Sequence, residues 1–187
     1  DPAGRITGAD LSETNRARNL DLLPRDDGAS LAEAHRALMA AIGRGAVVRR
    51  FEIEPDSVSV VAQFPGATPG LDDLSWTPWG LRKAPLPAFA EFTRRVRHEN
   101  RDAAFSLADL DVAALPKVKE AARGLVRRPD ARITEIAARK TAFSGELRWI
   151  LTFDGGSSRA MAVETNLAGE VRDLRVLDNG LGSVPRL

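Results

Sequence analysis

A run of alternating residues that ends in a glycine turn constrains the fold more than any other stretch of the chain. Its apolar members, spaced two apart with more polar neighbours, are Leu147, Trp149, Leu151 and Phe153. This is the period of a strand with one buried face. The Asp-Gly-Gly that follows at 154–156 favours a tight reversal, because glycine tolerates the positive φ that hairpin turns require. The sequence therefore predicts an antiparallel hairpin here, with Trp149 in the core.

A second run with the same layout lies upstream at 58–66. One constant spacing carries Val58 onto Leu147 and Val60 onto Trp149, and it also carries Gly66 onto Gly155. The matching parity matters, because a slip of one residue turns a buried face outward. We interpret the pair of runs as a duplicated unit.

A helix is expected before each run. Ser30 and Glu33 have the spacing of a capping box at the start of the first helix. Pro116 is well placed in the first turn of the second helix. Strands are expected at 47–53, 57–64 and 71–76, and then at 131–139, 146–153, 159–165 and 170–177. The stretch 105–111 is expected to be extended, and a helix is predicted over 88–98.

These elements predict an α+β fold of two repeated units, each a helix packed on a three- to four-stranded antiparallel sheet. The first unit spans 30–104 and includes an insert at 81–104. The second unit spans 105–178. Residues 1–29 form a partly mobile lead-in, and 179–187 form a loose tail.

A helix followed by an antiparallel meander, given twice, resembles the tandem PepSY-like and beta-lactamase-inhibitor-like modules. The resemblance is carried by the helix from Ser30 with strand 57–64, and by the helix from Pro116 with strands 146–177. It implies an extracytoplasmic bacterial protein that binds peptides or proteins, or regulates a partner, without catalysis. The insert at 81–104 departs from that pattern.

Composition excludes several classes of function. The net charge is +1 with the two signs interspersed, which argues against a dedicated nucleic-acid surface. There is no cysteine, so disulfides, thiolate catalysis and thiolate metal sites are excluded. No apolar run approaches the ~20 residues that span a bilayer. Arginine far outnumbers lysine and alanine is abundant, a bias typical of a GC-rich bacterial genome. Because the chain begins at Asp1, we expect a processed or excised part of a longer, membrane-associated protein, with any anchor outside it.

Candidate catalytic and metal-binding residues are sparse. His35 and His98 are the only histidines, and neither has a second histidine three or four residues away. The serines at 144, 157 and 158 lie in glycine-containing turns without the spacing of a nucleophile elbow. Asp72-Asp73 fits a turn or strand edge, and Asp111 fits a charge near a helix N-terminus. We predict no catalytic residue, no metal and no cofactor.

Two kinds of residue are candidates for binding. Trp76 and Trp79 flank a proline beside a turn, where indoles often anchor interfaces, although a satellite core is an equal alternative. The basic run Arg94, Arg95 and Arg97, and separately Arg127-Arg128, can meet phosphates or anionic lipid or form a solvated helix face.

The function predicted from these features is a non-enzymatic bacterial binding, sensory or regulatory module that recognises a peptide or protein. It would use a sheet face, a sheet edge or the groove between units, with Trp76, Trp79 and the arginines at 94, 95 and 97 as anchors. One alternative is a small hydrolase that uses a histidine with distant carboxylates. Another is a scaffold or assembly domain. The partner and the oligomeric state stay open.

Overall fold

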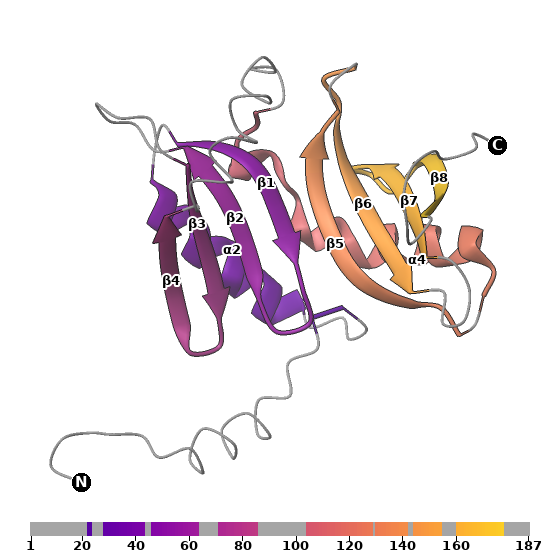
Figure 1. Cartoon of the computed structure of the whole chain (residues 1–187), viewed down its shortest axis with the longest axis horizontal. Helices are drawn as coiled ribbons and strands as arrows, with labels where there is room; N and C mark the ends of the chain where they lie inside the picture. Colours follow the sequence, from indigo (N-terminus) through magenta and orange to yellow (C-terminus); the bar gives the residue numbers. More distant parts are fainter. Residues whose placement is uncertain are drawn as a thin grey trace, which may run out of the picture.

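One antiparallel sheet of eight strands is the main element of the described part of the computed structural model (Figure 1). The structure describes residues 22–23, 28–43, 46–63, 71–85, 104–128, 130–141, 144–154 and 160–177. The strands are β1 (Val47–Ile53), β2 (Val58–Gln63), β3 (Leu71–Thr77), β4 (Gly80–Pro85), β5 (Arg132–Lys140), β6 (Leu147–Asp154), β7 (Ala160–Asn166) and β8 (Val171–Leu177). Their order across the sheet is β4-β3-β2-β1-β5-β6-β7-β8, and every neighbouring pair is antiparallel.

The sheet is continuous because β1 and β5 pair with each other. Phe51 lies opposite Ala138 and Ile53 lies opposite Ile136 in this central ladder. The prediction of two repeated helix-on-sheet units, each with its own three- to four-stranded sheet, is therefore wrong. A strand that ends a small sheet exposes unpaired backbone groups, and β1 and β5 satisfy theirs by pairing with each other. Local periodicity predicts strands but does not indicate which edges meet.

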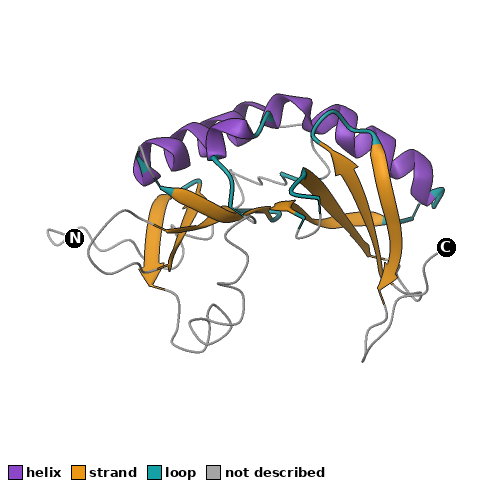
Figure 2. Cartoon of the chain, turned by 90° about the horizontal axis from the view of Figure 1, so that it is seen from above, coloured by secondary structure: helices purple, strands orange, loops and turns teal. Residues whose placement is uncertain are grey.

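Two α-helices lie on the same side of this sheet (Figure 2). Helix α2 (Gly28–Ile42) contacts β2 and β3, and helix α4 (Leu115–Val126) contacts β6 and β7. The expected apolar stripe of α2 is buried at Leu31, Ala34, Leu38 and Ile42. Pro116 lies in the first turn of α4, as predicted. The helices therefore cover one face of the sheet and leave the other face uncovered by them.

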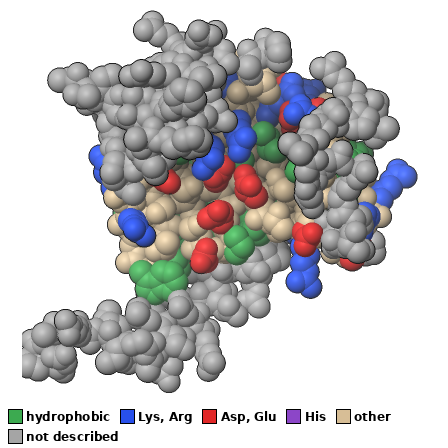
Figure 3. All heavy atoms as spheres, in the orientation of Figure 1, with side chains coloured by type: hydrophobic (Ala, Val, Ile, Leu, Met, Phe, Trp, Pro, Cys, Tyr) green, Lys and Arg blue, Asp and Glu red, His purple; other side chains and the backbone are tan. Residues whose placement is uncertain are grey.

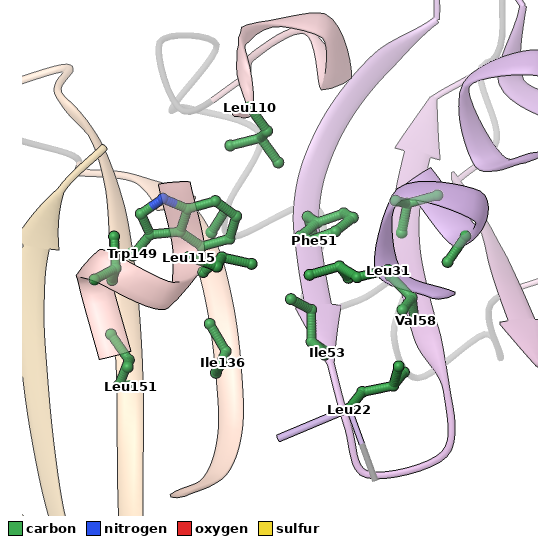
Figure 4. Packing of buried hydrophobic residues seen from close by; sticks show 14 of the residues in the cluster. Leu22, Leu31, Phe51, Ile53, Val58, Leu110, Leu115, Ile136, Trp149 and Leu151 are labelled. Atoms are coloured by element: carbon green, nitrogen blue, oxygen red, sulfur yellow. The ribbon is translucent and has the colours of Figure 1, made fainter. Parts of the chain in front are cut away.

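The core lies between the helices and the covered face of the sheet. Figure 4 shows Phe51 and Ile53 of β1 on one side of this layer, with Trp149, Leu151 and Ile136 on the other. Trp149 is fully buried, as predicted. Its ring packs edge to face on that of Phe51, with 6.1 Å between the ring centroids. Full burial of such side chains contributes about 1.5–3 kcal/mol each. A single buried cluster runs through both halves of the sheet, which agrees with the β1–β5 ladder.

The segment before α4 forms two short 3₁₀ helices, η2 (Leu107–Asp109) and η3 (Val112–Ala114). The expectation that 105–111 is extended is therefore wrong at 107–109, where η2 forms, whereas Ser106, Leu110 and Asp111 do have extended backbone. Phe105 forms a bridge with Val48. Ser106 and Asp109 form a capping box around η2. The Asp111 side chain accepts a hydrogen bond from the Ala113 amide at 3.0 Å, so this carboxylate caps η3. Polar caps thus redirect the backbone from an extended path.

Two leucines of the predicted lead-in belong to the core. Leu22 and Leu23 are almost completely buried. The Leu22 amide donates to the Pro55 carbonyl at 2.9 Å. The buried Lys119 ammonium donates to the Leu22 carbonyl at 3.2 Å. These bonds tie the leucine pair to the β1–β2 turn and to α4. The predicted helix at 88–98 and the tail at 179–187 lie outside the described residues.

Candidate binding surfaces

The face of the sheet that the helices leave uncovered carries a lattice of arginine–carboxylate pairs. Glu52 of β1 accepts from Arg50 at 2.7 Å and from Arg139 of β5 at 3.2 Å. Glu164 of β7 accepts from Arg148 of β6 at 3.1 Å and from Arg175 of β8 at 2.9 Å. Each carboxylate is more than nine-tenths buried, so its partners compensate for the water that it has lost. The Arg50–Glu52 pair lies within β1, whereas the other three pairs cross strand boundaries and link β5 to β1, β6 to β7, and β8 to β7.

Acidic side chains gather near the middle of this face (Figure 3). Burial raises the pKa of Glu52 above its usual value, and Arg50 and Arg139 oppose that rise. Burial also raises the pKa of Asp73 on β3, and the nearby Glu54 adds to the effect. Asp73 Oδ1 has no hydrogen-bond partner among the described residues. In the part of the chain that the structure describes, no group of three or more His, Asp or Glu side chains has an arrangement that could hold a metal ion.

The two outer strands of the sheet differ in the side chains that they expose. At the β8 edge, Arg172 and Arg175 are engaged in ion pairs with Glu146, Glu164, Glu170 and Asp173. The β4 edge instead begins at a tight turn in which Trp79 is 50% exposed and Leu81 is 46% exposed. Hydrophobic side chains form a patch where the β3–β4 turn lies, at the lower left of Figure 3.

Local backbone chemistry sets the exposure of Trp79. The Thr77 hydroxyl donates to the Gly80 carbonyl at 3.3 Å, and its oxygen accepts from the Trp79 amide at 3.4 Å. Gly80 has φ of 130°, a conformation that an L side chain rarely adopts. The turn therefore reverses the chain within Thr77–Gly80 and presents the indole outside the core. Leu81 comes next, opposite Trp76 in the β3–β4 ladder.

The residues predicted as binding anchors differ in their exposure to solvent. Trp76 is only 6% exposed and lies opposite Val58, so it is a core residue and not a surface anchor. Trp79 is the exposed member of the pair. Arg94, Arg95 and Arg97 lie outside the described residues, as does His98.

The remaining histidine is held by structural contacts. His35 Nε2 lies 3.0 Å from the Leu107 carbonyl, and its ring packs edge to face on Phe51. It therefore fixes η2 against α2. Ser144 is exposed beside the Thr141 hydroxyl in the β5–β6 turn, and the serines at 157 and 158 are outside the described residues.

Sequence reasoning missed two features of these surfaces. Leu81 and the strand β4 were hidden in a stretch assigned to an insert, because six residues ending in Pro85 give little period to detect. The charged lattice depends on which strands are neighbours. Its residues do alternate with core residues in the sequence, which is the one signal that could have placed them on the uncovered face.

Comparison with protein-family models, curated proteins and solved structures gives no match. Among the described residues, neither α-helix has the length and apolar character needed to cross a bilayer.

Proposed function

We propose that this chain is a non-enzymatic binding module that captures an extended segment of a protein or peptide along edge strand β4. The exposure of Trp79 and Leu81 at the start of that strand is the observation that carries the proposal. An outer strand offers unpaired amide and carbonyl groups to an incoming strand, and side-chain pockets beside it give specificity.

The two apolar side chains favour β4 over the opposite edge. Large apolar groups that are half exposed release water when a partner covers them, and tryptophan is prominent among residues that dominate interface energies. At the β8 edge the arginines are already paired within their own sheet. Adding a strand there would compete with those pairs.

The charges on β4 indicate the chemistry of the partner. Arg82 is exposed and makes no hydrogen bond or ion pair with the described residues, and the exposed Lys83 follows it. The segment that fits would place an apolar side chain against Trp79 and Leu81 and an acidic side chain beside Arg82. We further propose a sensory or regulatory role outside the cytoplasm of a bacterium, within a larger membrane-associated protein.

Selection of peptides from a random 12-residue display library on the full chain tests this proposal. Selected peptides should combine apolar and acidic residues, and a W79A/L81S variant should lose roughly tenfold or more of their affinity. V171S, which changes an exposed apolar residue on β8, is the matched control and should bind as the wild type does. Peptides that bind W79A/L81S with wild-type affinity but bind V171S weakly would contradict the assignment of the binding site to β4.

A further inference from the structure

A pocket at the end of α4 lies far along the sheet order from β4 and has a different chemistry. It has a volume of about 510 Å³ and is lined by Arg123, Val126, Arg127, Arg128, Ala131 and Phe153. Three arginines and three apolar residues therefore line one hollow. This volume is within the usual range for small-molecule sites.

The arginines of this pocket carry charge that the described chain does not neutralise. Arg128 is paired with Asp130 at 3.3 Å. Arg123 and Arg127, one helical turn apart, make no side-chain hydrogen bond or ion pair with the described residues. Asp154, the other carboxylate near Phe153, lies opposite Arg132 in the β5–β6 ladder. The pocket rim thus offers two uncommitted cations.

The backbone at Arg127 is consistent with a role for its side chain. This residue ends α4 with φ of 50°, and it is the one non-glycine residue with positive φ among those described. Glycine is the usual residue at such a position because it has no Cβ to clash. An arginine here gives up that advantage and keeps a guanidinium at the pocket.

The other three lining residues of the pocket are apolar. Phe153 is fully buried and Val126 nearly so, and the half-buried Ala131 joins them. A fully hydrated ion would gain nothing from these apolar residues. A ligand with an oxyanion at one end and an apolar group at the other would use both halves of the lining.

We propose that this pocket binds a phosphate group attached to an apolar moiety, with Arg123 and Arg127 holding the phosphate. Guanidinium groups match phosphate oxygens in geometry and charge. A soluble aryl or alkyl phosphate and a phospholipid headgroup both present this chemistry. The inference does not depend on peptide binding at β4.

Calorimetric titration of the full chain with phenyl phosphate and with inorganic phosphate tests the site. Phenyl phosphate should bind saturably and more tightly than inorganic phosphate. R123Q and R127G should each weaken phenyl phosphate binding roughly tenfold, as loss of a charge-assisted hydrogen bond does. R36Q, at an exposed arginine of α2, is the matched control and should bind as the wild type does.

R127G also separates binding from folding. Glycine suits the left-handed backbone, so this variant should unfold at or above the wild-type temperature while it loses phosphate affinity. Absence of saturable phenyl phosphate binding to the wild type would overturn the proposal, as would equal weakening by R36Q.

Vesicle sedimentation distinguishes the two sources of the phosphate. Retention on phosphatidylglycerol but not phosphatidylcholine vesicles, abolished by R127G and by excess phenyl phosphate, would identify a lipid headgroup. Binding of phenyl phosphate with no vesicle retention would identify a soluble ligand. Retention reduced equally by R36Q and R127G would indicate diffuse charge attraction and would contradict a pocket.

Discussion

Ile53 of β1 and Ile136 of β5 face each other across the middle of the sheet, and both side chains are completely buried. Their ladder is the place where the two runs of strands become one sheet. Because the same buried cluster extends to both sides of the ladder, neither run can lose its structure without exposing part of the other's core.

Truncation at this junction should therefore destabilise the whole sheet. I136A should lower the free energy of unfolding by about 2–5 kcal/mol, through lost burial and the cavity left behind. Urea unfolding followed by tryptophan fluorescence and by circular dichroism should still give coincident single transitions. V171A, at an exposed position, is the control and should change the free energy by less than about 0.5 kcal/mol. Two separated transitions in the wild type would show that the runs fold independently.

The two tryptophans near the β3–β4 turn should respond differently to truncation. W76A removes a buried indole and should cost about 3–5 kcal/mol of unfolding free energy. W79A removes a half-exposed indole and should stay within about 0.5 kcal/mol of the wild type. Thermal and urea denaturation of the two variants side by side measures the difference. Equal losses would make Trp79 a core residue and remove it from the binding surface.

A buried hydroxyl lies beside the central tryptophan. Thr165 is completely buried opposite Trp149, and its Oγ1 has no partner among the described residues. Valine has the same shape without the desolvated hydroxyl, so T165V should stabilise the fold by about 1–2 kcal/mol. The control is T134V, which removes an exposed hydroxyl that donates to the Thr152 carbonyl at 3.3 Å and should be neutral or slightly destabilising. A destabilised T165V would indicate that the hydroxyl has a partner, such as a buried water.

Asp73 predicts how stability depends on pH. Its pKa is raised in the folded state by burial, so the folded chain holds this proton more tightly than the unfolded chain. The contribution of Asp73 to the free energy of unfolding is therefore fully present below its usual pKa of 3.8. This contribution is lost as the pH rises through the raised pKa of the folded state. D73N should remove that loss, which urea titrations at a series of pH values would detect.

Asp130 supplies a control of opposite sign. The hydrogen bond from Arg128 lowers its pKa, so its contribution is present above 3.8 and is lost as pH falls through the lowered value. D130N should therefore weaken the chain only above that range. If the free energy of unfolding of D73N runs parallel to that of the wild type at all pH values, the raised pKa does not belong to Asp73.

The sequence predicts local elements well and their assembly poorly. The alternation at Trp149 and the capping pattern at Ser30 reflect interactions within a few residues, and both a strand and a helix form there. The β1–β5 ladder joins residues far apart in the chain, and no local pattern encodes it. For this reason seven of the eight strands were anticipated, whereas the single sheet was not.

The candidate sites show the same division. Exposure of Trp79 follows from a short turn with a threonine and a glycine, which are features visible in the sequence. Burial of Trp76 depends on its position opposite Val58, a strand away. The pocket at the end of α4 needs Phe153 from β6, so the arginines at 127 and 128 could be noted from the sequence but not placed in a cavity.

Hydrogen exchange of the β4 amides, measured with and without a selected peptide, tests the binding mode most directly. In an outer strand alternate amides point away from the sheet and exchange freely. If a partner adds as a strand, those β4 amides should become protected on peptide addition while the β8 amides keep their rates, and W79A/L81S should abolish the change. Protection at β8, or a bound peptide that leaves the β4 amides unprotected, would contradict strand addition at this edge.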